Sequence, residues 1–314
     1  MAGKRGRPVH GWLVLDKPVG MTSSQAVGAV RRILDAQKAG HAGTLDPLAD
    51  GVLPIALGEA TKTVSFAMTS QKTYRFTLCF GETRDTDDCE GSVIATHAHR
   101  PKLGDIKAVL PSFVGVIEQI PPAFSALKIN GKRAYELARA GLNPQMAPRK
   151  VEIFEAKLLN LPDQDHAVFE IRCGKGTYIR SLARDLARRL GTEGHVSALR
   201  RTVCGRFHED MAISLDSLRD LGHSAAAQEQ LLAVKTPLDD IPAVAVNGPD
   251  AARLKRGQEI ILHVSYPLLV GGTVLCLSAK TQQPVALAEY GGGTLRPVRV
   301  FNLPTDGDHD VGYS

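Results

Sequence analysis

HAGTLDPLADGVLP, residues 41–54, places one carboxylate, Asp46, between Leu45 and Pro47 in a stretch with little other chemistry. Pro47 restricts the backbone of Asp46 to extended conformations, so the direction of its side chain is partly fixed. The apolar neighbours on both sides predict a surface beside Asp46 from which water is largely excluded. In such a place the ionised form of a carboxylate is favoured only beside a cation. Asp46 is therefore either a turn residue, as isolated Asp-Pro pairs commonly are, or a reactive carboxylate with a basic partner.

The composition is that of a globular protein with a real core. The chain has 314 residues, of which 43% are hydrophobic and 23% charged, enough for one large domain and a small one. It has no apolar run long enough to span a membrane, and its basic N-terminus lacks the apolar core of a signal peptide. We therefore expect a cytoplasmic location and no membrane partner.

The five cysteines are scattered, with no Cys-x-x-Cys spacing. An odd count in such a chain indicates reduced thiols rather than a disulfide framework, and zinc is not expected. The acidic segment 85–91 superficially resembles a calcium loop but lacks the glycine and the glutamate that such a loop requires. It is interpreted as a polar turn, so the sequence predicts no metal site.

The net charge of +5 is distributed unevenly, with basic clusters at the N-terminus, at Arg31–Lys38, along residues 180–189 and at Arg200–Arg201. Asp306, Asp308 and Asp310 gather near the C-terminal end. Separated basic clusters either form a face that follows phosphates or are simply solvated helix surface. Charge alone leaves both interpretations open.

Hydrophobic periodicity predicts an α+β fold around a mixed, largely antiparallel sheet. The expected strands are 11–18, 51–58, 72–80, 114–120, 150–161, 166–173 and 195–207. One expected helix begins at Thr22 or Ser23, and three others cover 102–110, 134–140 and 178–191. A turn is expected at Asn130-Gly131. A boundary near 239–242 separates a large domain, 10–240, from a small β-barrel, 242–304. The tails 1–9 and 305–314 are expected to be flexible.

Two further segments carry candidate chemistry. In GKGTYIRSLARDL (174–186), Arg180 falls near the start of a helix, where its charge opposes the helix dipole, so it is expected to have a specific partner. Tyr74 lies on the apolar face of strand 72–80, where its ring serves either core packing or stacking on a ligand.

Five segments together resemble the TruB family of tRNA pseudouridine synthases, in the same order along residues 10 to 240. They are GHAGTLDPLADGVLPIALGEATK (40–62), LDKPVGMTS (15–23), KTYRFTLCFGETRDTDD (72–88), IPPAFSALKINGKRAYELAR (120–139) and CGKGTYIRSLARDLARRLG (173–191). The resemblance implies the pseudouridine synthase catalytic fold. Residues 242–304 look like the small PUA-type RNA-binding barrel appended to these enzymes.

By this resemblance, the protein isomerises uridine 55 of the tRNA T-loop to pseudouridine after flipping the base out of the loop. Asp46 would be the catalytic residue, held ionised by Arg180, whereas the sequence leaves open whether it attacks a carbon or takes a proton. The other implied site residues are Tyr74 stacking on the base, Tyr178 supporting the pocket, Leu199 in its wall, Lys17 and Pro18 bracing it, and His41 filling the vacated space or making a structural hydrogen bond. The implied partner is the tRNA T-arm, with no cofactor, no metal and no protein partner, and a monomer is expected.

Three alternatives remain from the sequence. The chain could bind RNA without catalysis, as a chaperone of tRNA folding, and such a role could also accompany catalysis. It could be a glycosidase that uses Asp46 and Asp50, if the two carboxylates flank one bond about 5–10 Å apart. It could also be a guide-RNA-dependent catalytic subunit of the same superfamily.

Overall fold

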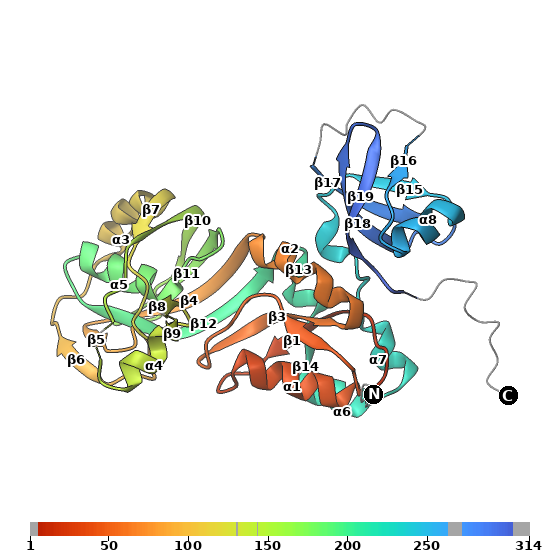
Figure 1. Ribbon diagram of the computed structural model, residues 1–314. Coiled ribbons are helices and arrows are strands. Elements are labelled where there is room, and N and C mark those ends of the chain that lie inside the picture. The colour runs from red at the N-terminus through yellow and green to blue at the C-terminus, as the bar shows by residue number, and fades with distance from the viewer. Residues whose placement is uncertain (1–5, 130, 143, 263–271, 304–314) are drawn as a thin grey trace.

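The computed structural model describes residues 6–129, 131–142, 144–262 and 272–303, and two separate sheets form its framework (Figure 1). Ten strands build the larger sheet: β1 (Gly11–Lys17), β2 (Ala39–His41), β3 (Ala49–Leu57), β4 (Lys72–Phe80), β7 (Gly115–Gln119), β10 (Arg149–Asn160), β11 (His166–Cys173), β12 (Gly194–Cys204), β13 (Phe207–His208) and β14 (Ile213–Ser214). Two hairpins stand apart from it, β5 (Glu82–Arg84) with β6 (Val93–Thr96) and β8 (Lys128–Ile129) with β9 (Lys132–Arg133).

The large sheet has the strand order β14-β1-β3-β12-β4-β11-β10-β7, with β2 paired to β3 and β13 to β12. Only the β1–β14 and β3–β12 pairs are parallel, which confirms a mixed, largely antiparallel sheet. The long strands β4 and β12 lie at its centre and join two halves (Figure 1). Segments far apart in sequence, the loop before β3 and the junction after β11, therefore approach the same central strands.

Helices cover the sheet at both halves. They are α1 (Ser23–Ile33), α2 (Val64–Thr69), α3 (Leu103–Val109), α4 (Ala134–Arg139), α5 (Ile179–Arg189), α6 (Leu215–Leu221) and α7 (Ala225–Glu229), with short 3-10 turns η1 (Gly58–Thr63), η2 (Leu110–Phe113), η3 (Glu209–Met211) and η4 (Thr236–Leu238). Helix α1 packs beside β2, β3 and α6, whereas α5 packs on β12 and β4. Among the described residues, no helix is long and apolar enough to cross a membrane.

Local sequence explains where α1 begins. Thr22 is the N-cap: its hydroxyl accepts a hydrogen bond from the Gln25 backbone N–H at 3.2 Å, and the Gln25 side chain returns a bond to the Thr22 backbone. This reciprocal capping box satisfies two backbone donors that the first helical turn leaves free. Of the two caps that the sequence left open, Thr22 is the one used, and Ser23 is buried instead.

Strand β3 begins at Ala49, two residues before the expected strand, within a segment interpreted as loop. The reason is tertiary, because Ala49 pairs in parallel with Leu199 of β12. Gly51, at φ +93°, then lies between β1 and β12, and a Cβ there would fall 2.3 Å from the Arg201 carbonyl oxygen. Only glycine combines this backbone conformation with this close approach.

The second sheet contains β15 (Ala243–Val246), β16 (Ile260–Ile261), β17 (Gly272–Ser278), β18 (Pro284–Gly291) and β19 (Thr294–Val300). Its order, β15-β17-β18-β19-β16, describes a curled sheet or half-barrel in the expected region. Helix α8 (Gly248–Lys255) covers it and was not expected. Asn247, which caps that helix, and Pro249 in its first turn were the sequence signals.

The two ends of the chain were expected to be flexible tails. Residues 305–314 and 1–5 lie outside the described residues, as does Asn130 of the expected turn. Residues 6–9 make fixed contacts: the Arg7 N–H donates to the Asp35 carbonyl, and Val9 packs against the main core. Arg7 also forms a bridge with Ala36 in the loop after α1, so residues 6–9 contact the large domain.

Candidate active site

The loop between β2 and β3 carries Asp46, and neighbouring segments hold its backbone. The buried Ser23 hydroxyl accepts from the Leu45 N–H at 2.8 Å and donates to the Leu45 carbonyl at 3.0 Å. On the other side, the Pro47 carbonyl accepts from the Gly20 N–H at 2.8 Å. These bonds flank Asp46 without using its carboxylate, which is therefore positioned but left available.

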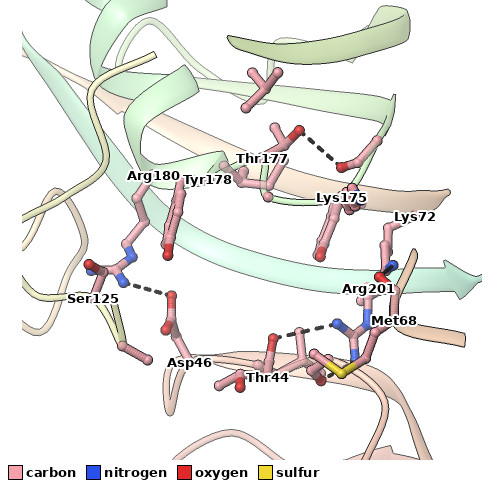
Figure 2. Close-up of a pocket in the computed structure, with 18 of the residues that line it drawn as sticks. Thr44, Asp46, Met68, Lys72, Ser125, Lys175, Thr177, Tyr178, Arg180 and Arg201 are labelled. Carbon is pink, nitrogen blue, oxygen red and sulfur yellow. Dashed lines mark hydrogen bonds and ion pairs between the residues drawn. The ribbon is translucent and has the colours of Figure 1, made fainter. Parts of the chain in front are cut away.

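Arg201 of β12 supports the same loop from below. The residue is 1% exposed, and its guanidinium donates to the carbonyl oxygens of Val52 at 2.8 Å, Gly43 at 3.2 Å and Thr44 at 3.5 Å. The partners of this buried cation are thus backbone dipoles on both sides of Asp46. Figure 2 shows Arg201 beside Thr44, away from the carboxylate.

Arg180, in the first turn of α5, faces the Asp46 carboxylate, as Figure 2 shows. Its Nη2 lies 2.9 Å from Asp46 Oδ2, and its Nη1 lies 3.2 Å from Asp88 Oδ2. The same guanidinium donates to the carbonyls of Thr86 and Phe124. The ion pair expected between Arg180 and Asp46 is confirmed, and its cation is 4% exposed. Buried charge-assisted bonds of this kind fix the geometry of the carboxylate.

Asp88 was missed as a site residue. It lies in the segment interpreted as a polar turn, which is a turn in the structure, but its side chain is 3% exposed and contacts Arg180. Its neighbour Asp87 contacts Arg184 at 2.8 Å. The arginines at 180 and 184 are therefore neither solvated surface nor a phosphate-binding face. The sequence carried a signal for these ion pairs. Two acidic residues are adjacent at the end of segment 72–88, and Arg180 and Arg184 lie one helical turn apart, so each arginine can face one carboxylate.

A pocket of about 730 Å³ opens above this ion pair. Of the residues expected at the site, it is lined by Asp46, Tyr74, Tyr178, Arg180 and Leu199. Tyr74 comes from β4 and Leu199 from β12, the two central strands, while Tyr178 is the residue immediately before α5. The Gln119 side chain, also missed, bonds to both the N–H and the carbonyl of Tyr178, at 2.8 and 3.1 Å.

Both tyrosines are protonated at neutral pH, and burial moves the pKa of each further above it. It raises the pKa of Tyr74 to about 12, with the Arg201 charge opposing the shift. Burial likewise raises the pKa of Tyr178. Each therefore offers an aromatic face and a neutral hydroxyl, which suits stacking and hydrogen bonding rather than proton abstraction.

Three expected site residues lie outside the wall of this pocket. Lys17 is fully buried and donates to the carbonyls of Pro18 at 2.8 Å and Met21 at 2.7 Å, so it braces the loop that bonds to Pro47. Burial lowers the pKa of Lys17 to about 8, although the charges of Asp50 and Asp46 oppose this. Pro18 is exposed beside it.

His41 ends β2 and is half-buried. Its Nδ1 is buried and finds no hydrogen-bond partner in the described part of the chain. Burial lowers its pKa, and the nearby Arg201 charge lowers it further, so the ring is neutral at pH 7.

Asp50 is not part of the pocket. Its carboxylate contacts Arg200 at 3.1 Å, and the same arginine also holds Asp16 and Glu209. A glycosidase needs two carboxylates on either side of one bond, and a carboxylate engaged in this cluster outside the pocket does not serve as the second. Within the described ranges, no group of three or more His, Cys, Asp or Glu side chains could hold a metal ion.

Comparison with known proteins identifies the relatives of this chain. Residues 31–179 match the model of the TruB family pseudouridylate synthase N-terminal domain, and 180–241 match the tRNA pseudouridylate synthase B C-terminal domain. Proteins named tRNA pseudouridine synthase B from Bradyrhizobium diazoefficiens and Caulobacter vibrioides are 57% and 50% identical to the chain. The alignments cover 95% and 96% of this chain and 87% and 98% of those proteins.

Solved structures share the fold. A Cbf5-Nop10-Gar1 complex gives a TM-score of 0.71 at 26% identity over 94% of this chain and 85% of that one. An H/ACA RNP bound to a substrate RNA containing 2'-deoxyuridine gives 0.71 at 24% identity, over 98% and 92%. With the family models covering two thirds of its length, the chain belongs to the TruB family of pseudouridylate synthases.

Proposed function

We propose that this protein converts uridine 55 of the tRNA T-loop to pseudouridine, with Asp46 as the catalytic residue. The observation that carries the proposal is the Asp46 carboxylate, 35% exposed, which lines a pocket while a buried arginine holds it at 2.9 Å. The names of relatives that are 57% and 50% identical supply tRNA as the substrate class.

The reaction needs a carboxylate that is both ionised and aimed. The N1–C1′ bond of the nucleoside breaks, the uracil turns within the pocket, and a C5–C1′ bond forms while the C5 proton leaves and N1 gains one. Asp46 either adds to a carbon or takes a proton from the ribose, and each role requires the ionised form. Arg180 holds the carboxylate at 2.9 Å, and the bonds of Ser23 to Leu45 set the direction of the loop.

The target base must first leave its loop, which costs a few kcal/mol that pocket contacts offset. The Tyr74 ring and the apolar Leu199 side chain provide walls for a flat base. Lys150 and Lys175, both exposed at the pocket, can contact the flanking phosphates. The basic character of the chain thus supports RNA binding through these residues rather than through the buried arginines of α5.

We further propose that the chain acts alone on tRNA, as a cytoplasmic monomer, rather than as a guide-RNA-dependent subunit. The relatives at 57% and 50% identity are named for tRNA, whereas the complexes with further proteins share the fold at 24–26% identity. His41, Lys17 and Pro18 act in this scheme by supporting the loop and the space beside it.

The test uses a T-arm stem-loop that carries tritium at C5 of its uridines, with wild-type protein and Asp46→Asn compared side by side. We expect wild type to release tritium from one uridine, the one equivalent to position 55. Asp46→Asn should lose about a thousandfold or more in rate, since its amide cannot act as a base or nucleophile. Its affinity for the RNA should stay within about twofold, because the substitution is nearly isosteric.

Two outcomes would contradict the proposal. Tritium release by Asp46→Asn at the wild-type rate would remove the catalytic role, and a large loss of RNA affinity would make Asp46 structural. A stem-loop with cytidine at the target position is the control for site specificity. The same variant also tests the chaperone role: annealing of tRNA halves no faster than in buffer would remove it.

A further inference from the structure

Gln119 is the last residue of β7, the edge strand of the large sheet. The alternation of side chains along the strand places it on the same face as Ile117, and it is only 1% exposed. It pairs in register with Arg149, the first residue of β10, which lines the pocket. A buried amide is expected to find its hydrogen-bond partners within the protein, so those partners show what Gln119 does.

Both ends of the Gln119 amide bind the backbone of one residue, Tyr178. Gln119 Oε1 accepts from the Tyr178 N–H at 2.8 Å, and Gln119 Nε2 donates to the Tyr178 carbonyl at 3.1 Å. Tyr178 is the N-cap of α5, in an extended conformation with φ −105° and ψ 113°, and its own side chain makes no capping bond. Because the N–H and the carbonyl lie on either side of the Cα, the two bonds together restrict both backbone dihedrals of Tyr178.

The body of α5 is held independently of the Gln119 side chain. The carbonyl of Ile120 accepts from Ser181 Oγ at 2.8 Å and from Arg184 Nη2 at 2.9 Å. The helix also packs on the central strands β12 and β4. Loss of the Gln119 amide should therefore release the backbone of Tyr178 while the rest of α5 stays in place.

Tyr178 projects from that backbone into the pocket. Figure 2 shows its ring extending from the start of α5 toward the Asp46 carboxylate, and both residues line the same cavity. Burial raises the pKa of Tyr178, and the negative charge of Asp46 adds to this effect, as expected for a phenol within electrostatic range of a carboxylate. The rotamers open to a side chain depend on its φ and ψ, so a shift of the Tyr178 backbone would move the ring relative to Asp46.

We propose that Gln119 is a positioning residue for the isomerisation, which fixes the backbone of Tyr178 so that the Tyr178 ring faces Asp46 and the base that reacts beside it. This inference rests on the proposed function. Gln119 is not part of the pocket wall, so it acts through Tyr178 and not on the substrate itself. A misplacement of about 1 Å in such a group can lower a rate by about a hundredfold.

The test measures kcat and KM of Gln119→Met and of wild type on the tritiated T-arm stem-loop. Methionine is similar in size to glutamine but makes neither bond to Tyr178. We expect kcat to fall about tenfold while KM stays within about twofold, because the walls formed by Tyr74 and Leu199 are unchanged. Gln119→Glu keeps an acceptor for the Tyr178 N–H, so it should recover part of the loss, with kcat about threefold below wild type.

The matched control is Gln37→Met. The Gln37 side chain also binds backbone, donating to the Gly6 carbonyl at 2.9 Å, but it lies in the loop after α1 and does not line the pocket. This variant should keep kcat within about twofold of wild type, even if it lowers the urea midpoint as Gln119→Met does.

A double-mutant cycle separates positioning from a general loss of stability. Tyr178→Ala removes the ring but keeps the backbone groups that Gln119 binds, and it should lower kcat. In that background, Gln119→Met should lower kcat by less than about twofold further, because the ring that it positions is already absent. Two residues that act independently would instead show the same tenfold loss in both backgrounds.

The outcomes separate this inference from the proposed function. An unchanged kcat in Gln119→Met overturns the positioning role, as does a rise in KM alone, and an equal further loss in the Tyr178→Ala background shows that Gln119 does not act through the ring. In each of these cases catalysis by wild type still stands. If Gln119→Met does not fold, Gln119→Glu tests the same predictions with the smaller expected loss. No turnover by wild type would refute the proposed function, and the inference would fall with it.

Discussion

Arg180 and Arg201 are both buried at the pocket, one at the α5 wall and one beneath the Asp46 loop, and they are stabilised differently (Figure 2). Arg180 contacts two carboxylates, Asp46 and Asp88, whereas the hydrogen bonds of Arg201 go to backbone carbonyls. The first arrangement places a positive charge opposite the carboxylate that we propose as catalytic. In the second, the cation stabilises the geometry of the loop. A buried arginine beside a pocket can therefore hold a carboxylate or shape a backbone, and its partners show which of the two it does.

The largest effect should come from Arg180→Ala. Asp88 would lose its counter-charge in a buried site, which costs about 3–5 kcal/mol in the free energy of unfolding. The rate should fall by about a hundredfold or more, because the Asp46 carboxylate loses the guanidinium that holds it in place. Single-turnover rates and urea unfolding measure the two effects.

Arg184→Ala is the control for that variant, since it breaks the Asp87 pair on the same helix without touching Asp46. It should lower stability but leave the rate close to that of wild type. An equal loss of rate in Arg184→Ala and Arg180→Ala would contradict a specific role for the Arg180–Asp46 pair.

Arg201→Ala should have the next largest effect. The buried carbonyl of Val52 would lose its side-chain donor, at about 1–3 kcal/mol, and the part-buried bonds to Gly43 and Thr44 would be lost as well. The loop would then sample other positions, so kcat should fall about tenfold or more. A wild-type kcat in Arg201→Ala would show that the loop does not depend on this arginine.

Asp88→Asn sharpens the comparison with a smaller change. The amide keeps an acceptor for Arg180 and removes one of its two anionic partners, which leaves Asp46 as the remaining one. We expect a loss of about 1–2 kcal/mol in the free energy of unfolding and a rate lower by about three- to tenfold. Wild-type stability together with an abolished rate would instead make Asp88 a direct participant.

The smallest effect concerns Tyr74. Because burial raises the pKa of Tyr74 to about 12, its hydroxyl stays protonated where an ordinary tyrosine, with a pKa of about 10, begins to ionise. The alkaline limb of the rate profile should therefore be the same in wild type and in Tyr74→Phe. Near-ultraviolet absorbance of tyrosinate checks this directly, and a titration below pH 10 that disappears in Tyr74→Phe would contradict it.

Local sequence patterns predicted many of the strands and helices. Strand 72–80 and helix 178–191 appear as β4 and α5 with ends within two residues, because period-2 and period-3.6 burial leave strong signals. Helix α8 was missed, since its eight residues bury only Leu254 deeply and carry a weak apolar stripe. The early start of β3 was missed because the parallel partner at Leu199 lies 150 residues away.

The sequence by itself determined which residue is the candidate nucleophile or base and what kind of partner it needs. Asp46 in its Asp-Pro context and Arg180 at a helix start are local features, and their chemistry follows from burial and the helix dipole. Only the tertiary structure decided that Asp88 forms a second ion pair with Arg180 and that Arg201 lies under the loop. It also decided that Glu59 and Lys62 form hydrogen bonds with the backbone at the end of β19. Those contacts depend on the strand order β3-β12-β4-β11 and on the docking of the second sheet. Both arise from hydrogen bonds and burial between distant segments, which no local pattern encodes.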